Sequence, residues 1–279
     1  MRKLFYTIPS SIGSLLPMTK DLKKIITTAR YAATEAGSVI LSLFNKAQVH
    51  YKDLNDPVTQ ADIDAQEKIT GIIKEQFPSH QFLNEEDTRE QDYDSDHLWI
   101  IDPLDGTNNY IGGIPHFGVS VAYAEKGVLK AGVVYDPVRD EMFYADSGGA
   151  YLNEKPIRVT TTETLKGAVV ATGFSTDRGE PVEKTCDIVK MLLKNDIRAF
   201  RRMGSAALDL CWVACGRLDA YFEYSLHTWD FAGGAHIVKQ AGGECVSSQG
   251  TELRLDSSGV IASNSVLFDA FKRKTAWKK

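Results

Sequence analysis

Two aspartates, Asp102 and Asp105, stand in a setting that favours metal binding. A short apolar run typical of a buried strand leads to Asp102, and Asp105 follows three residues later. Pro103 cannot donate to a sheet ladder, so we expect the strand to end there. Two carboxylates at the end of a buried strand are costly unless a cation neutralises them. Oxygen ligands of this kind suit a hard divalent ion such as Mg²⁺.

The residues after Asp105 could hold an anion beside that ion. Gly106 and Thr107 supply a flexible backbone and a small hydroxyl where a new helix could begin. Free backbone N–H groups at a helix start attract phosphate. Metal and phosphate together indicate phosphoryl chemistry. The alternative is a solvated Asp-Pro-x-Asp-Gly turn, because all of these residues favour turns.

Three further acidic segments strengthen the metal-site hypothesis. Glu85 follows an apolar pair at what reads as another strand end. Asp230 precedes a helix predicted over Phe231–Ala241, and Asp62 completes a Thr-Gln-Ala-Asp segment at the start of a helix that reaches about Phe77. Each has an ordinary alternative: a solvated charge run around Glu85, an N-cap at Asp230 and a capping box at Asp62.

In their combination and order, these segments resemble the inositol monophosphatase family of metal-dependent, lithium-sensitive phosphomonoesterases. The resemblance extends from about Lys20 to the C-terminus. It rests on two segments far apart in the chain, Asp102–Thr107 with a tryptophan ahead of it, and Trp229–Gly234. The chain has Asn84 where the family usually has glycine. We expect this to alter the local turn more than the neighbouring ligand, because asparagine also tolerates left-handed backbone angles.

The resemblance implies a role for each matching residue. Two or three Mg²⁺ ions would be held by Glu85, Asp102, the Leu104 carbonyl, Asp105 and Asp230. Gly106 and Thr107 would bind the phosphate through their N–H groups. The catalytic group would comprise Glu85 and Thr107, which orient the attacking water, and Asp62, which lies near that water and a third, weaker metal. The substrate would contact Asp105, Gly204, Ser205, Ala206 and Glu223.

The function implied is Mg²⁺-dependent hydrolysis of a small polyol or sugar phosphate, with inositol monophosphate as the favoured substrate. One metal ion would activate the water and another would stabilise the departing alkoxide. Similar proteins act on fructose 1,6-bisphosphate, 3′-phosphonucleotides, histidinol phosphate or NADP, and the shared motifs do not separate these substrates. For Glu223, an exposed acid at a strand end is the alternative. A non-catalytic metal-binding regulatory protein is the competing hypothesis from another class.

Composition narrows the remaining classes. The 279 residues carry a formal net charge of −5, which argues against a general nucleic-acid binder. No apolar stretch approaches the ~20 residues needed to span a membrane. The four cysteines form no Cys-x-x-Cys motif, and Cys211 and Cys215 read as core residues one helical turn apart. We therefore expect a cytoplasmic protein. The family resemblance implies a homodimer.

The periodicity of apolar residues predicts an α+β first half and an α/β second half. A long helix over residues 22–43 precedes antiparallel strands at Gly118–Tyr123, Leu129–Tyr135 and Glu141–Ala145. Strands and helices alternate in the second half. The resemblance implies a layered α-β-α-β-α sandwich. We divide the chain into an N-terminal extension (1–19), in which Met18 is an alternative start, a half with the main metal site (20–155) and a half that contributes Asp230 and the substrate pocket (156–279).

Overall fold

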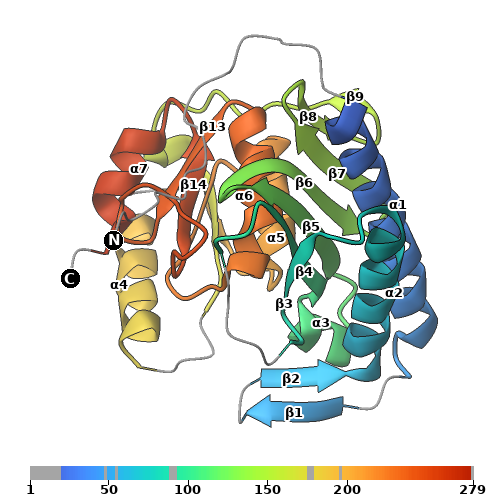
Figure 1. Ribbon diagram of the computed structural model, residues 1–279. Helices are drawn as coiled ribbons and strands as arrows, with labels where there is room; N and C mark the ends of the chain where they lie inside the picture. Colours follow the sequence, from blue (N-terminus) through green and yellow to red (C-terminus); the bar gives the residue numbers. More distant parts are fainter. Residues whose placement is uncertain are drawn as a thin grey trace.

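The computed structural model describes residues 20–46, 49–53, 56–87, 93–174, 179–194 and 197–277; the predicted extension 1–19 lies outside them. Five layers follow one another across the molecule, α-β-α-β-α, as expected from the family resemblance (Figure 1). Helices α1 (Lys20–Leu43) and α2 (Gln60–Gln76) form the first layer and pack against a seven-stranded sheet. Two helices fill the space between this sheet and a five-stranded sheet, whose far face is covered by two more.

The seven-stranded sheet carries the chemistry-bearing strand β4. Its strands run in the order β3-β4-β5-β6-β7-β8-β9, with β3 parallel to β4 and every later neighbour antiparallel. The three predicted antiparallel strands are present as β5, β6 and β7. The bounds are β3 Gln81–Asn84, β4 His97–Asp105, β5 Gly118–Glu125, β6 Val128–Asp136, β7 Glu141–Asp146, β8 Gly149–Leu152 and β9 Lys155–Pro156.

One expectation about β4 is wrong. The strand does not end at Pro103 but continues to Asp105, and its register against β5 shifts between Asp102 and Asp105. Such an irregularity accommodates a residue without an N–H, because the ladder bonds are interrupted where the proline stands. The short helix α3 (Thr107–Ile111) starts directly afterwards, with Gly106 at its N-cap at a φ of 101°.

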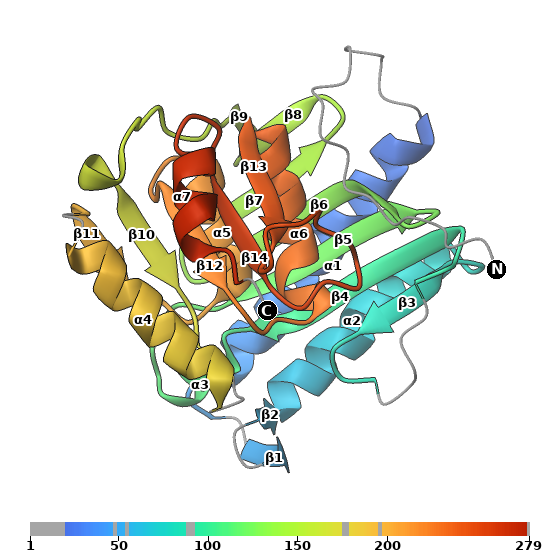
Figure 2. The same ribbon diagram turned by 90° about the vertical axis from the view of Figure 1, so that its left-hand side faces the viewer.

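Helices α5 (Ala206–Ala214) and α6 (Thr228–Gln240) form the central layer, and in Figure 2 they lie behind the five-stranded sheet. Helix α6 begins at Thr228 rather than at the predicted Phe231. It approaches β6 so closely that a Cβ added to Gly132 would lie 2.5 Å from the carbonyl oxygen of Gly233. Gly132 and Gly233 therefore let α6, and Asp230 with it, lie close against the sheet that carries β4, whereas Gly234 faces Leu210 of α5.

The second sheet is mixed rather than purely parallel. Its order is β11-β10-β12-β14-β13, in which β10 runs parallel to both of its neighbours and the remaining pairs are antiparallel. The short strands β11 and β13, and the hairpin β1–β2, were not predicted. The bounds are β1 Val49–Asp53, β2 Asp56–Thr59, β10 Val169–Thr172, β11 Ala199–Arg201, β12 Ala220–Glu223, β13 Gly243–Ser247 and β14 Val260–Asn264, with α4 at Glu180–Lys194 and α7 at Phe268–Thr275.

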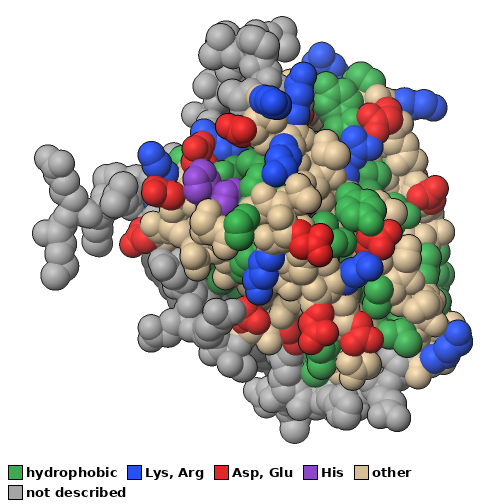
Figure 3. Space-filling view, turned by 45° about the vertical axis from the view of Figure 1, so that its right-hand side comes forward, with side chains coloured by type: hydrophobic (Ala, Val, Ile, Leu, Met, Phe, Trp, Pro, Cys, Tyr) green, Lys and Arg blue, Asp and Glu red, His purple; other side chains and the backbone are tan. Residues whose placement is uncertain are grey.

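The largest buried cluster joins the two sheets through α5 and α6. Cys211 belongs to this cluster and Cys215 packs against it, as the sequence predicted. On the outer face over α1 and α2, acidic, basic and hydrophobic side chains are interspersed (Figure 3). None of the helices in the described ranges combines the length and the apolar character needed to cross a membrane.

Candidate active site

A cavity of about 290 Å³ opens where the end of β4, the start of α5, the start of α6 and the end of β12 meet. These elements belong to the two sheets and to the helical layer between them, so residues distant in sequence converge on one space. The predicted residues that line it are Glu85, Asp102, Leu104, Asp105, Gly106, Thr107, Gly204, Ser205, Ala206, Glu223 and Asp230. Of the predicted site residues, only Asp62 is not part of the lining.

Asp102 and Asp105 lie on the irregular end of β4, where the register shift lets both carboxylates serve one cavity. The Leu104 N–H donates to Oδ1 of Asp102 at 3.0 Å. Asp105 accepts three hydrogen bonds from the start of α5, from the Ser205 hydroxyl and from the N–H groups of Ala206 (3.2 Å) and Ala207 (2.7 Å). Asp105 is therefore held at the N-terminus of α5, where N–H groups and the helix dipole favour a carboxylate.

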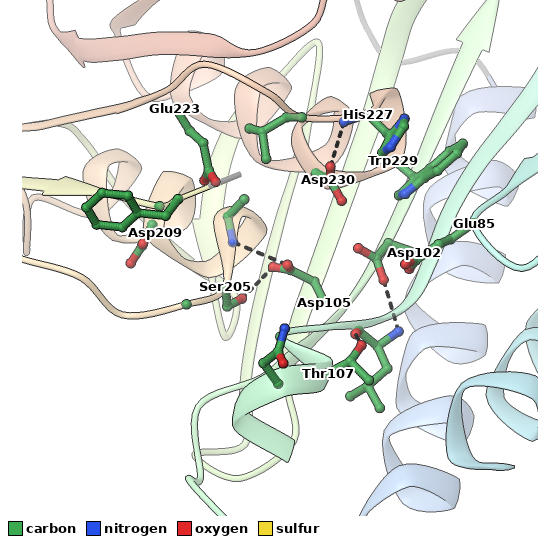
Figure 4. A pocket seen from close by; sticks show the side chains of 18 of the residues that line it. Glu85, Asp102, Asp105, Thr107, Ser205, Asp209, Glu223, His227, Trp229 and Asp230 are labelled. Carbon is green, nitrogen blue, oxygen red and sulfur yellow. Dashed lines mark hydrogen bonds between the residues drawn. The ribbon is translucent and has the colours of Figure 1, made fainter. Parts of the chain in front are cut away.

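Asp230 comes to the same cavity from the other side. It is the third residue of α6 and accepts a hydrogen bond from the His227 N–H at 2.6 Å through Oδ2. It therefore helps to cap α6, but from inside the helix and not from the N-cap position considered in the sequence analysis. Figure 4 shows the carboxylates of Asp230, Asp102, Asp105 and Glu85 turned toward one shared space.

Electrostatics indicate that these carboxylates repel one another. Burial, followed by the charges of Glu85, Asp105 and Asp230, raises the pKa of Asp102 well above its usual range. The pKa of Asp230 is also raised well above its usual range, first by burial and then by the charge of Glu85. Burial raises the pKa of Asp105 to about 6, although its hydrogen bonds to α5 oppose the shift. A cluster of this kind is stabilised in its ionised form only by a nearby cation.

The donor set fits Mg²⁺. It consists of oxygen atoms alone, from Glu85, Asp102, Asp105 and Asp230, together with the Leu104 carbonyl, and hard divalent ions prefer such ligands. Within the described ranges, no three His, Cys, Asp or Glu side chains already form a closed metal site. This suits Mg²⁺, which usually keeps several waters and few protein ligands.

Asn84 does not adopt the left-handed backbone angles considered in the sequence analysis. Asn84 is the last residue of β3 and pairs with Ile101 of β4 in extended conformation. Its amide donates to Asp87 at 3.0 Å, and the N–H of Glu85 donates to the Ile101 carbonyl at 3.1 Å. Glu85 thus remains aligned with β4 and lines the cavity, and left-handed backbone angles are not needed.

Thr107 connects the cavity to Asp62. Its hydroxyl lies 3.0 Å from the Leu104 carbonyl and 3.2 Å from Oδ1 of Asp62, so either oxygen can accept its proton. Asp62 is fully buried and forms the capping box of α2 with Thr59, as one reading of the sequence suggested. The Thr59 N–H donates to Oδ2 of Asp62 at 2.8 Å. Asp62 therefore acts structurally and also reaches the cavity, through Thr107.

Glu223 lies at the opposite end of the cavity from Asp102, at the end of β12 (Figure 4). It is buried rather than exposed, so the alternative of an exposed strand-end acid is wrong. The Tyr221 hydroxyl donates to its Oε2. Burial raises the pKa of Glu223 to about 7, against the effect of that hydrogen bond and of Arg202.

Sequence reasoning missed several cavity residues. Gly173 follows β10 and lies directly beneath the Glu223 carboxylate; Arg202 and Asp209 flank the small residues at the start of α5; Tyr221 supports Glu223. No local motif marks Gly173 or Tyr221. Asp209 carried a signal that was overlooked, because a carboxylate in the otherwise apolar segment Ala206–Ala214 is unusual in a buried helix.

Comparison with known proteins agrees with this geometry. The family model described as the inositol monophosphatase family matches residues 21–278. The chain belongs to this family.

Similar proteins span most of the chain. Nus factor SuhB of Pasteurella multocida is 40% identical over 245 residues, which cover 86% of this chain and 91% of that protein. Inositol monophosphatase 3 of Solanum lycopersicum is 40% identical over 258 residues, covering 90% of this chain and 96% of that protein. Among solved structures, extragenic suppressor protein suhB of Bartonella henselae has a TM-score of 0.85 at 34% identity, covering 90% of this chain and 98% of that one. SaIMPase-II with inositol monophosphate bound has a TM-score of 0.76 at 28% identity, covering 90% of this chain and 93% of that one.

Proposed function

We propose that this protein is a Mg²⁺-dependent phosphomonoesterase that hydrolyses a polyol phosphate, with inositol monophosphate as the favoured substrate. The observation that carries the proposal is the convergence of Asp102 and Asp105 from β4 with Asp230 from α6 on one cavity. Their raised pKa values indicate a site that needs a cation. Membership of the inositol monophosphatase family supports a phosphatase.

The ions would be held by Glu85, Asp102, the Leu104 carbonyl, Asp105 and Asp230, in keeping with the oxygen-only donor set. When bound, they would neutralise charge on the phosphate and make a nearby water more acidic. We assign two or three ions to the site. The Ser205 hydroxyl and the α5 N–H groups hold Asp105 in one orientation, so this ligand does not need to be ordered on binding.

The chain's own residues supply the positioning that phosphoryl transfer requires. Thr107 carries a hydroxyl whose position is set by Leu104 and Asp62, and we assign it, with Glu85, to orienting the attacking water. Gly106 and Thr107 line the cavity beside the metal carboxylates, and we assign them to binding the phosphate. At the other end, Glu223 would accept a hydrogen bond from a hydroxyl of the alcohol part, with Gly204 and Ala206 leaving room for it.

Release of inorganic phosphate tests the proposal. The purified protein should hydrolyse inositol monophosphate in the presence of Mg²⁺, lose activity in excess EDTA and recover it when Mg²⁺ is restored. Li⁺ should inhibit it, an expectation taken from the family. Full turnover in EDTA would overturn the metal-dependent mechanism. Parallel assays with fructose 1,6-bisphosphate, 3′-phosphonucleotides and histidinol phosphate decide the substrate, since a faster reaction with one of these would replace inositol phosphate.

A second candidate role comes from the relatives that are named Nus factor SuhB. This chain could serve as a Nus factor with or without catalysis. The variant Asp230→Asn separates the two roles, because it removes a metal ligand within the cavity and leaves the outer surface unchanged. Phosphate release should be lost in this variant, whereas a role that depends on the protein surface should survive.

A further inference from the structure

Asp209 is a cavity residue to which the proposed mechanism gives no role. It lies in the first turns of α5 and lines the same cavity as Glu223, on the side away from Asp102 and Glu85 (Figure 4). Its exposed fraction is 1%. A carboxylate in this position has been taken out of water, and such groups are normally paired or hydrogen-bonded.

Within the described part of the chain, Oδ1 of Asp209 is buried and has no hydrogen-bond partner. The other carboxylates at this end of the cavity differ in this respect. Asp105 accepts three hydrogen bonds from the start of α5, and Glu223 accepts one from the Tyr221 hydroxyl. A buried acceptor that no protein donor satisfies, on the wall of a cavity, indicates that its donor belongs to a ligand.

The charges around Asp209 limit what that ligand can be. Burial and then the charges of Asp105 and Glu223 raise its pKa, while Arg202, an exposed residue on the cavity wall, opposes them. At this end of the cavity, the carboxylates of Asp209 and Glu223 therefore outnumber the single guanidinium of Arg202. A second phosphate group would be repelled by Asp209 and Glu223, whereas neutral hydroxyl groups can donate to both acceptors.

We propose that Asp209 is a specificity-determining residue that, together with Glu223, accepts hydrogen bonds from two hydroxyl groups of the alcohol part of the substrate. This inference rests on the proposed phosphatase function and makes its substrate class narrower. The preferred ester is a monophosphate whose alcohol carries at least two free hydroxyls. A site built to accept hydrogen bonds discriminates strongly against analogues that lack the donor, because the buried acceptor is then left unpaired.

The test compares two esters in wild-type protein and in Asp209→Asn. Inositol 1-phosphate carries the hydroxyls, and 4-nitrophenyl phosphate has none on its alcohol part. Asparagine keeps the size of the side chain but replaces an acceptor oxygen with a donor. We expect kcat/KM for inositol 1-phosphate to fall about 10- to 100-fold, mainly through KM, with little change for 4-nitrophenyl phosphate. Asp187→Asn, the same replacement at an exposed position on α4, is the matched control and should change neither value.

Other outcomes decide against the inference. Equal losses for both esters, or no loss for either, would overturn the role of Asp209 while leaving the phosphatase function intact. Higher wild-type activity on a bisphosphate or on an amino-alcohol phosphate would overturn the hydroxyl requirement. Failure of the wild type to hydrolyse any ester would overturn the proposed function and this inference with it. Asp209→Ala, measured beside the asparagine variant, must show the same change in substrate ranking, which protects the test against a variant that does not fold.

Discussion

The carboxylate of Glu223 lies directly against the backbone of Gly173, so closely that a Cβ at Gly173 would be 2.0 Å from Oε2. Gly173 follows β10 and Glu223 ends the neighbouring strand β12, which runs parallel to β10. The absence of a side chain at Gly173 therefore creates the space in which Glu223 is held by Tyr221. Gly173 therefore fixes where the Glu223 carboxylate can lie, although it has no reactive atom of its own.

Gly173→Ala should change substrate preference as a Glu223 variant would. The added methyl meets the far end of a side chain rather than backbone, so Glu223 can move and the fold should be kept. We expect kcat/KM for inositol 1-phosphate to fall about 10-fold, the loss of one hydrogen bond to a charged group, with 4-nitrophenyl phosphate nearly unaffected. Glu223→Gln is the comparison variant, and a double variant should lose no more than either single one. Additive losses would show that Gly173 acts elsewhere.

Thr107→Val should lower kcat strongly. Valine matches the shape of threonine but lacks the hydroxyl that lies between Leu104 and Asp62. Loss of one positioned hydrogen bond in a catalytic site costs on the order of 10²-fold. Thr107→Ser retains the hydroxyl and is the control, which should keep most of the activity. Mg²⁺ titration of the activity should give a similar midpoint in all three proteins. Equal activity of the valine and serine variants would remove this hydroxyl from the mechanism.

The fold could be predicted where the signal is local. The buried face of α1 and the hairpins of β5, β6 and β7 follow from periodicity and turn residues near in sequence. The continuation of β4 past Pro103 could not be predicted, because the register shift depends on pairing with β5. Strands β11 and β13 are short and are defined by their neighbours in the second sheet rather than by their own residues.

The residues of the candidate site likewise differ in whether their signal is local. Asp102, Asp105 and Asp230 could be predicted because their residue types and flanking segments are distinctive, and the structure brings them together in one cavity. Gly173 could not, since its contact with Glu223 arises only where β10 and β12 meet, whereas Asp209 is marked in the sequence only as a carboxylate in an otherwise apolar helix. For Asp62, the capping interpretation is confirmed by the contact of Oδ2 with Thr59, while Oδ1 accepts from Thr107 and the catalytic role stays a prediction.

Asp230→Asn should abolish most activity without unfolding the protein. Asparagine can still accept the hydrogen bond from the His227 N–H, so α6 should remain capped. The substitution also removes one charge from a cluster of repelling carboxylates, so the variant should melt at or above the wild-type temperature in EDTA. Added Mg²⁺ should raise its melting temperature less than that of the wild type, because a ligand that binds the folded state more weakly stabilises it less. A wild-type Mg²⁺ shift with wild-type kinetics would show that Asp230 is only a helix cap.

His236→Leu should make the protein less sensitive to acid. His236 lies in α6 with an exposed fraction of 3%, and both of its ring nitrogens lack hydrogen-bond partners within the described residues. Burial, followed by the positive charges of Lys239 and Lys130, lowers its pKa from 6.5 to about 4. Between these two values the unfolded chain binds a proton that the folded chain does not. The contribution of neutral His236 to the free energy of unfolding is therefore fully present above pH 6.5 and is lost as the pH falls toward 4.

At pH 5 the two pKa values of His236 correspond to a loss of about 2 kcal/mol in the free energy of unfolding. Urea denaturation at pH 7.5 and pH 5 measures it, with the wild type and the leucine variant compared at each pH. The difference in shape between histidine and leucine changes the free energy of unfolding equally at both pH values. The informative quantity is therefore how the gap in unfolding free energy between the two proteins changes with pH. We expect that gap to shift by about 2 kcal/mol in favour of the variant at pH 5. A gap that is the same at both pH values would show that His236 is not protonated differently in the folded and unfolded chains.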